Sequence, residues 1–300
     1  MLDFRVETFL AVCRHMNFTK AARELNITQP AVSHHIHYLE QAYGTALFQH
    51  NGKRLQLTEA GEILRRTLLT MKHDEQHLQK RMQQAASGTR DYSFGATLSV
   101  AEFMINEALG RFLQLHPDSH IQMQVADTKV LLSKLDSGEL DFAVVEGDFP
   151  KAEYDFFVFG TEEYVAAGDP EKAARYRGRR LTDLLVEPLL LREEGSGTRV
   201  ILEYYLKEHG LAAADFARTV EIGNIGAIKT LLKSGYGVSF LYRAAIRPEE
   251  AAGTLGVIEL SDFRLRHDIM FLFPKNSNFR ADYTAIFREL RACAEETGSA

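Results

Sequence analysis

The chain has 300 residues, long enough for two or more domains that each bury a core. Its content of 45% hydrophobic and 25% charged residues is ordinary for a soluble globular protein. No apolar run approaches the roughly 20 residues that a membrane-spanning helix requires, and the first residues lack a signal-peptide pattern. Cys13 and Cys293 lie far apart without metal-ligand spacing, so we expect reduced thiols in a cytoplasmic protein.

The net charge of −6 is unevenly distributed along the chain. Residues 1–90 contain 12 Lys and Arg against 8 Asp and Glu, which leaves +4 there and −10 on the remainder. Such segregation is expected when one module meets phosphate groups and another does not. Five histidines before residue 51 can add positive charge at lower pH.

An amphipathic helix is expected over residues 3–15, with Phe4, Phe9, Leu10 and Val12 on its apolar side. Two shorter helices follow, whose apolar sides carry Ala21, Ala22 and Leu25, and then Val32, Ile36, Leu39 and Tyr43. Between them, Asn26 tolerates the left-handed conformation that ends a helix, and Thr28 can cap the next helix through its hydroxyl.

This pattern predicts a helix-turn-helix, whose second helix enters the DNA major groove. The outward side of that helix carries mostly hydrogen-bonding residues, namely Gln29, Ser33, His34 and His37. The alternative is a pair of amphipathic helices joined by a polar turn in an all-helical domain.

A hairpin is predicted after Gly44, because Asn51-Gly52 is a strong turn signal between Leu47-Phe48 and Leu55-Gln56-Leu57. Such a wing would place Lys53 and Arg54 near a phosphate or the minor groove. The alternative for these two residues is a solvated turn.

One long helix is expected over residues 58–86, capped by Thr58. A heptad pattern runs along it, with a single polar interruption at Glu75, through Leu64, Leu68, Met71, Glu75, Leu78, Met82 and Ala85. Two such helices would join two DNA-binding modules and imply a two-fold DNA site. The alternative is an amphipathic helix that packs on its own domain. Ser87-Gly88-Thr89 is predicted to end the helix as a hinge.

From Tyr92 the pattern becomes α/β. We expect strands at 93–97, 121–125, 142–145, 164–167, 189–191, 219–222, 237–241 and 269–273. The expected helices are one containing Phe103, Leu109, Phe112 and Leu113, one containing residues 130–135, and others at 198–209, 225–234 and 279–294. The last strand and helix have no partner in the second series of elements, so we assign them to the first lobe.

The sequence therefore predicts an all-α winged helix-turn-helix domain over residues 1–58 and a linker helix with its hinge over 59–90. A two-lobed α/β domain follows over 91–300, with lobe I at about 91–160 and 268–300 and lobe II at about 161–267. Chain crossings near Gly160 and His267 imply a cleft that can hinge.

Ligands of open α/β sheets bind where strands end and helices begin. The candidates at such places are Thr97, Leu98 and Ser99, then Thr128, then Glu146, and finally Ser196, Gly197 and Thr198. In the last group, two glycines around Ser196 let successive backbone N–H groups point into one concavity at a helix N-terminus. A small anion is the expected ligand. The alternatives are an N-cap with a glycine turn for this run, and a cap of its own helix for Thr128.

Doubly wound lobes are common in enzymes, so an enzyme is an alternative for this chain. Gly-x-Ser-x-Gly spacing, a phosphate-loop lysine and a His-Glu-x-x-His pattern are all missing from the sequence. His34, His35 and His37 are close together, but residues 34 and 35 diverge on a helix and favour a DNA-facing role over a metal site. We therefore expect no catalytic residues, no metal site and no cofactor.

Residues Phe9–Gly61 resemble the N-terminal domain of LysR-type transcriptional regulators. The matching runs are Phe18-Thr19-Lys20-Ala21-Ala22, Leu25-Asn26-Ile27-Thr28-Gln29-Pro30-Ala31-Val32-Ser33, Leu39-Glu40, Gly44-Thr45-Ala46-Leu47-Phe48 and Leu57-Thr58-Glu59-Ala60-Gly61. The resemblance implies DNA contacts by Gln29, Pro30 and Ser33, with Thr28 beside them and Thr19 and Lys20 supporting a phosphate contact. His34 and His50 stand where the family usually has arginine, so its base preference does not transfer.

The resemblance continues through the remaining chain in layout. It implies an effector domain similar to periplasmic solute-binding proteins, promoter DNA as partner, and a tetramer of two dimers. The run Gly195-Ser196-Gly197-Thr198-Arg199 is similar to a segment of the subgroup connected with sulfur and cysteine metabolism. We therefore expect a ligand-responsive regulator that senses a small anionic metabolite. The alternative is a cytosolic sensory protein that binds a small molecule without promoter affinity.

Overall fold

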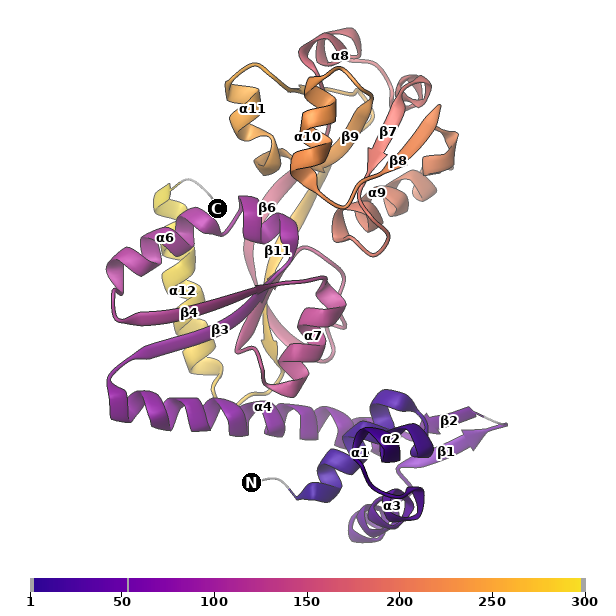
Figure 1. Ribbon diagram of the computed structural model, residues 1–300, viewed down its shortest axis with the longest axis vertical. Coiled ribbons are helices and arrows are strands. Elements are labelled where there is room, and N and C mark those ends of the chain that lie inside the picture. The colour runs from indigo at the N-terminus through magenta and orange to yellow at the C-terminus, as the bar shows by residue number, and fades with distance from the viewer. Residues whose placement is uncertain (1–2, 53, 298–300) are drawn as a thin grey trace.

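A computed structural model describes residues 3–52 and 54–297. The chain begins with a helical domain and a small hairpin, continues into one long helix, and ends in a two-lobed α/β domain (Figure 1). The N-terminal elements are α1 (Phe4–His15), α2 (Phe18–Glu24), α3 (Gln29–Tyr43), β1 (Phe48–Asn51), β2 (Arg54–Leu57) and α4 (Glu59–Ser87).

Local capping residues set the boundaries of these helices. Thr28 accepts a hydrogen bond from the backbone N–H of Ala31 at 3.3 Å, and Thr58 accepts one from Gly61 at 3.0 Å. Asn26 has a φ of 54°, which places it in the left-handed conformation after α2. Gly88, with a φ of 74°, ends α4. The predicted helix boundaries are confirmed at these points. They could be predicted because each depends on a single local interaction.

The core of the N-terminal domain forms where α1, α2 and α3 meet the start of α4. Its buried side chains include Phe9, Leu10, Val12, Ala21, Val32, Ile36, Leu39, Leu64 and Leu68. Two residues expected in this core are exposed instead: Phe4 at 58% and Tyr43 at 56%. They occupy the first residue of α1 and the last residue of α3, at the ends of their helices.

The heptad pattern of α4 divides into two parts. Leu64 and Leu68 are buried in the core of the N-terminal domain, so they follow the alternative interpretation of the pattern. Met71, Leu78 and Met82 are 47%, 48% and 66% exposed on the same helix. Only the second half of the pattern is therefore available to a partner.

The C-terminal domain is built on one continuous sheet in the order β4-β3-β5-β11-β6-β9-β7-β8, with β10 paired to β6. The strands are β3 (Arg90–Ala96), β4 (Ser119–Val125), β5 (Phe142–Val145), β6 (Tyr154–Gly168), β7 (Pro188–Leu191), β8 (Arg218–Glu221), β9 (Val238–Tyr242), β10 (Gly256–Ile258) and β11 (Leu265–Pro274). The helices are α5 (Leu98–Phe103), α6 (Asn106–Leu115), α7 (Thr128–Ser137), α8 (Pro170–Arg175), α9 (Gly197–Glu208), α10 (Ile225–Lys233), α11 (Arg247–Ala251) and α12 (Arg280–Thr297).

Two long antiparallel strands, β6 and β11, connect the lobes (Figure 1). One end of β11 pairs with β5 in lobe I, while the far end of β6 pairs with β9 in lobe II. A register shift lies between Ile269 and Met270, opposite Gly160. The part of β11 from Met270 onward pairs with β5, and α12 packs against α6.

Two elements differ from the prediction. The strand expected from residue 164 begins at Tyr154, because its first half is held by β11, which lies more than a hundred residues away in the sequence. The single helix expected around Phe103 and Phe112 is two helices. They break at Met104 and Ile105, and both of these side chains are buried in the core. Among the helices of the described residues, none is long and apolar enough to cross a membrane.

Candidate DNA-reading surface and candidate effector site

The exposed face of α3 carries the predicted DNA-contacting side chains. Gln29, Pro30, His34 and His37 are exposed and Ser33 is half-buried, while Val32, Ile36 and Leu39 on the opposite face are buried. The side-chain amide of Gln29 donates to the Ser33 hydroxyl at 2.9 Å. His35 points elsewhere and contacts the Thr8 hydroxyl at 2.9 Å. The polar side of α3 is therefore open to a ligand, whereas the apolar side holds the domain together.

The other DNA-contact candidates surround this helix. Thr19 and Lys20 are exposed in the first turn of α2, and Thr28 is exposed at the N-cap of α3. The β1–β2 hairpin pairs Asn51 with Arg54, and the Arg54 side chain is exposed. Lys53 lies outside the described residues. The hairpin and α3 occupy the same end of the molecule (Figure 1).

A hollow of about 230 Å³ separates α3 from the hairpin. Its lining includes Ser33 and His37 from α3 and His50 from β1. The two positions at which the chain carries histidine in place of the family's arginine, 34 and 50, are both exposed at this end. These side chains give the surface donors and acceptors of hydrogen bonds.

Five polar residues predicted as effector contacts are buried where the lobes meet: Thr97, Ser99, Glu146, Ser196 and Thr198. Glu146 follows β5 in lobe I, and Gly197 begins α9 in lobe II. A Cβ atom added to Gly197 would lie 3.3 Å from Oε1 of Glu146. Glu146 also hydrogen-bonds the Ser99 side chain, and a Cβ atom added to Gly147 would lie 2.6 Å from the Thr128 hydroxyl oxygen. The structure therefore brings together all four sequence segments that were predicted to line the effector site.

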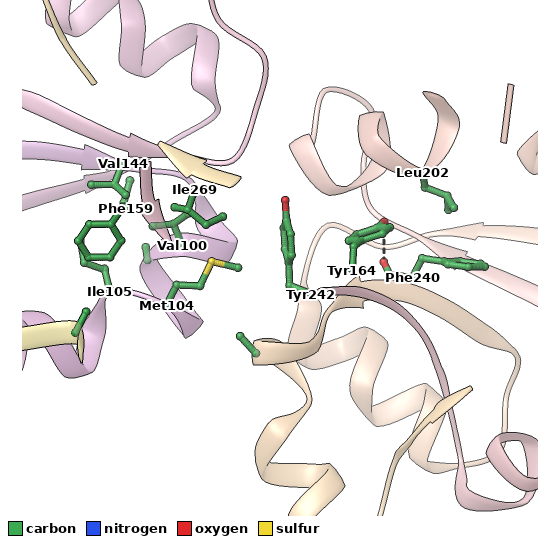
Figure 2. Packing of buried hydrophobic residues seen from close by; sticks show 14 of the residues in the cluster. Val100, Met104, Ile105, Val144, Phe159, Tyr164, Leu202, Phe240, Tyr242 and Ile269 are labelled. Atoms are coloured by element: carbon green, nitrogen blue, oxygen red, sulfur yellow. Dashed lines mark hydrogen bonds between the residues drawn. The ribbon is translucent and has the colours of Figure 1, made fainter. Parts of the chain in front are cut away.

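Several buried polar atoms at this junction have no hydrogen-bond partner among the described residues. They are the Thr97 hydroxyl, Oε2 of Glu146, the Tyr242 hydroxyl and Nδ1 of His267. A buried polar atom left unpaired costs on the order of 1–3 kcal/mol. Figure 2 shows Tyr242 on the side of lobe II that faces Val100 and Met104 of lobe I. Unpaired atoms contributed from both lobes are typical of a ligand site.

The sequence interpretation missed Tyr242 and His267. Tyr242 is the last residue of β9, so the rule that ligands bind at strand ends could have identified it. His267 lies within β11, where the sequence offers no comparable signal. Their rings lie 6.4 Å apart.

The N-terminus of α9 is not capped by a side chain. Ser196 occupies the N-cap position without a capping hydrogen bond, and its hydroxyl lies 2.9 Å from the Thr198 hydroxyl. Gly195 has a φ of 90°, the left-handed conformation that favours glycine. The helix therefore presents its N-terminal positive potential, with two hydroxyl groups beside it, toward the junction.

Burial sets the electrostatics of the junction. It raises the pKa of Glu146 to about 7, against the opposing effect of its hydrogen bond with Ser99 and of the nearby Arg192. It also lowers the pKa of His267 and raises that of Tyr242. The guanidinium of Arg192, although buried, forms an ion pair with Glu193 at 2.6 Å. Much of its positive charge is thus compensated locally.

Leu98 and Thr128 are less buried than the five polar candidates. Leu98 is half-buried at the start of α5. Thr128 is half-buried as well, and it lines a cavity of about 690 Å³ shared with α1, α4 and α7. Asp127 holds the N-cap position of α7, so Thr128 is the first residue of that helix and not its cap.

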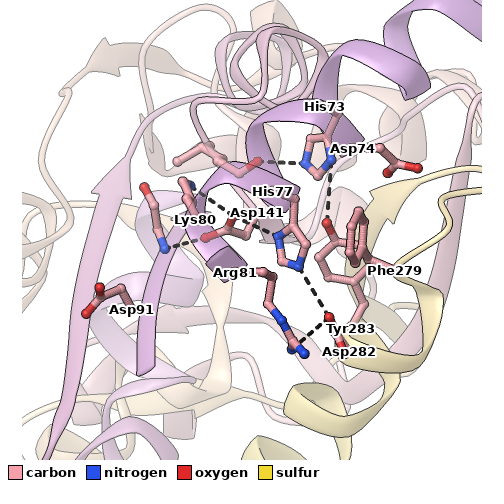
Figure 3. Close-up of polar contacts among 12 residues, drawn as sticks. His73, Asp74, His77, Lys80, Arg81, Asp91, Asp141, Phe279, Asp282 and Tyr283 are labelled. Carbon is pink, nitrogen blue, oxygen red and sulfur yellow. Dashed lines mark hydrogen bonds and ion pairs between the residues drawn. The ribbon is translucent and has the colours of Figure 1, made fainter. Parts of the chain in front are cut away.

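A second buried polar cluster joins the linker helix α4 to lobe I (Figure 3). His77 lies between Asp141 and Asp282, 3.4 Å from each, and Lys80 reaches Asp141 at 2.9 Å. His73 donates from Nε2 to the Leu140 carbonyl at 2.9 Å. Asp74 accepts from the Ser277 hydroxyl at 2.5 Å. The sequence interpretation treated this helix as a dimer seam, with packing on its own domain as the alternative. It missed the cluster, because the partners come from residues more than 60 positions away.

Two family models match this chain, one in its N-terminal part and one in its C-terminal part. The profile described as "Bacterial regulatory helix-turn-helix protein, lysR family" matches residues 5–62, and "LysR substrate binding domain" matches residues 86–294. The RuBisCO operon transcriptional regulator of Acidithiobacillus ferrooxidans is 28% identical over 97% of this chain and 94% of its own. The HTH-type transcriptional regulator CysL of Bacillus subtilis is 25% identical over 89% of each chain.

A solved structure covers nearly the whole fold. Full-length LysG from Corynebacterium glutamicum, with bound effector Arg, aligns with a TM-score of 0.62 at 18% identity. The alignment covers 99% of both chains. At this identity the likeness concerns the fold: a helix-turn-helix domain joined to a two-lobed α/β domain.

Proposed function

Because the chain belongs to the LysR family of DNA-binding transcriptional regulators, we propose that the exposed face of α3 reads promoter DNA and that the lobe junction binds an anionic effector. The observation that carries the first part is the orientation of α3. Its hydrogen-bonding residues Gln29, Ser33 and His34 lie outward while its apolar residues are buried. A helix so placed can enter the major groove, where base edges present donors and acceptors.

The proposal assigns the phosphate contacts to side chains around α3. Arg54 on the hairpin and Lys20 on α2 are exposed cations on elements next to it. Contacts of this kind fix the position of a protein on DNA without reading sequence. Gln29 and Ser33 are assigned to base contacts, because a side-chain amide and a hydroxyl can pair with base edges.

The effector assigned to the junction is a small oxyanion such as a carboxylate, sulfate or phosphate compound. Supporting this are the uncapped N-terminus of α9, the hydroxyls of Ser196 and Thr198, and the unpaired polar atoms of the opposite lobe. LysG carries the bound effector Arg, so a protein of this fold takes up a small molecule. The effector is bound and released unchanged, without catalytic turnover.

The proposed assembly is a homotetramer of two dimers, acting in the cytoplasm where promoter DNA lies. The exposed half of the α4 seam, with Met71, Leu78 and Met82, is assigned to one dimer contact. The effector shifts the arrangement of DNA-binding domains only if it binds one arrangement more tightly than another. The cluster of His73, Asp74 and His77 links α4 to lobe I and gives this coupling a physical path.

Two titrations test the proposal. In a gel-shift assay at a stated salt concentration, the full chain should retard a fragment from upstream of its own gene more strongly than unrelated DNA of equal length. In thermal-shift measurements, small oxyanions should raise the melting temperature of the parent but not of a Ser196→Ala, Thr198→Ala variant. Equal retardation of both fragments contradicts the DNA assignment, and equal shifts in both proteins contradict the effector site.

A further inference from the structure

Glu146 has an unusual position for a carboxyl group at an anion site. Its Oε1 lies next to Gly197, the first residue of α9, and its Oε2 is buried without a partner. The side chain is 3% exposed, so solvent cannot stabilise a charge there. An ionised Glu146 would repel an anion held at the same helix N-terminus, whereas a neutral carboxyl group could donate a hydrogen bond to it.

The charges around Glu146 come from three other elements. Arg192, after β7, favours its ionised form, but the ion pair with Glu193 occupies that guanidinium. Asp127, before α7, favours the neutral form. Tyr242, at the end of β9, adds a hydroxyl whose pKa is raised by burial and by Glu146 itself. No uncompensated cation among these neighbours holds Glu146 in its ionised form.

On the basis of the proposed effector site, we propose that Glu146 determines ligand specificity. It takes up one proton from solvent when a doubly charged oxyanion binds at the N-terminus of α9. The neutral carboxyl group then donates its O–H to the anion, while the helix N–H groups and the hydroxyls of Ser196 and Thr198 hold the other oxygens. Each binding event therefore takes up one anion and one proton together.

The pKa of about 7 for Glu146 makes this uptake measurable near neutral pH. Above that pH the free protein must gain a proton to bind, so the apparent affinity falls by up to about tenfold for each pH unit. Sulfate is a suitable probe because it remains a dianion throughout the range, so any pH dependence belongs to the protein.

The experiment measures sulfate binding to the full chain by calorimetry at pH 6.5 and pH 8.5, in buffers that differ in ionisation enthalpy. We expect binding about tenfold or more weaker at pH 8.5, with close to one proton taken up per sulfate at that pH. Glu146→Gln keeps the shape and an N–H donor but cannot titrate, so its affinity should be the same at both pH values.

Two further variants separate this proposal from its rivals. His267→Gln should keep the pH dependence of the parent, because His267 is not the group that takes up the proton. Thr198→Ala should weaken sulfate binding at both pH values, which tests the anion site alone.

Each outcome is decisive. A pH-independent sulfate affinity in the parent, together with weakening by Thr198→Ala, overturns the role of Glu146 and leaves the anion site standing. Tighter binding at pH 8.5 also overturns it and indicates a ligand whose cationic group pairs with ionised Glu146. Failure of the parent to bind sulfate at either pH rejects the oxyanion class and this proposal together. If Glu146→Gln does not fold, the pH profile and proton count of the parent still decide.

Discussion

At the scale of single residues, burial raises the pKa of two carboxyl groups and lowers the pKa of one imidazole. Glu146 and Asp136 are carboxyl groups whose pKa values are raised by burial, to about 7 and about 6. His73 is an imidazole whose pKa is lowered by burial to about 4. In all three, burial disfavours the charged form and shifts the pKa toward the neutral one. Glu146 lies at the lobe junction, Asp136 lines the cavity near α4, and His73 belongs to the polar cluster of α4.

His73 should make the protein sensitive to acid. Its folded pKa of about 4 lies below the ordinary 6.5, so the unfolded chain binds more protons between these values and the free energy of unfolding falls as the pH drops from 6.5 toward 4. The full effect is at most about 3 kcal/mol.

Urea unfolding of the parent and His73→Gln at pH 7.5 and pH 5 measures this contribution. The variant should lose less stability on acidification than the parent. A matched change at the exposed His34, to Gln, should leave the pH dependence unaltered. Identical acid sensitivity in parent and His73→Gln would show that His73 does not titrate in this range.

At the scale of elements, the sequence best predicts those helix boundaries and turns that a single local interaction determines. Thr28, Asn26 and Thr58 set helix boundaries that follow from capping alone, and the hairpin follows from Asn51-Gly52. The first half of β6 could not be predicted, since β11 stabilises it from more than a hundred residues away. The burial of Leu64 and Leu68 could not be predicted either, since a heptad pattern does not specify its partner.

The same limit applies to the candidate sites. The outward residues of α3 follow from helical periodicity, and Glu146 and Ser196 follow from the strand-end rule. Tyr242, His267 and the linker cluster are brought into place by tertiary packing. Sequence periodicity carries no information about such contacts.

A close approach of α4 to the segment before β1 provides a test of local packing. A Cβ atom on Gly61 would lie 2.1 Å from the backbone carbonyl oxygen of Leu47, which cannot move aside without disturbing the hairpin. Gly61→Ala should therefore destabilise the N-terminal domain by roughly 1–3 kcal/mol, as overpacking does.

Gly110→Ala is the matched control, because that helical glycine has nothing within 4 Å of the added carbon. It should raise stability by roughly 0.5–1 kcal/mol. Thermal unfolding followed by circular dichroism distinguishes the two. A Gly61→Ala protein as stable as the parent would mean that this contact is looser than the structure indicates.

The exposed half of the α4 seam predicts how self-association depends on sequence. Leu78→Lys and Met82→Lys add charge to side chains that are already exposed, so the fold should survive while the proposed dimer should dissociate at least tenfold more readily. Sedimentation velocity across a concentration series measures the change.

The control for the seam is Leu68→Ala. That residue is buried in the N-terminal domain, so the substitution should cost about 2–5 kcal/mol of stability through a cavity. Unchanged association in both lysine variants would assign the dimer contact to another surface.

At the scale of the whole molecule, two connections relate the proposed sites. The strands β6 and β11 join the lobes, and in the proposed mechanism an effector bound at the junction shifts one lobe against the other. The polar cluster of α4 then ties lobe I to the helix that continues into the DNA-binding domain. An effector that favours one arrangement of the lobes can thereby bias the placement of α3.

The most direct test of this account is the base preference of the DNA-binding domain, measured by selecting bound sequences from a random DNA pool. Gln29→Ala and Ser33→Ala should change which bases are selected, because these side chains are assigned to base edges. Arg54→Ala should weaken binding to all sequences about equally, because it is assigned to phosphate. If all three variants select the same bases with the same affinity as the parent, α3 does not read DNA and the central claim is contradicted.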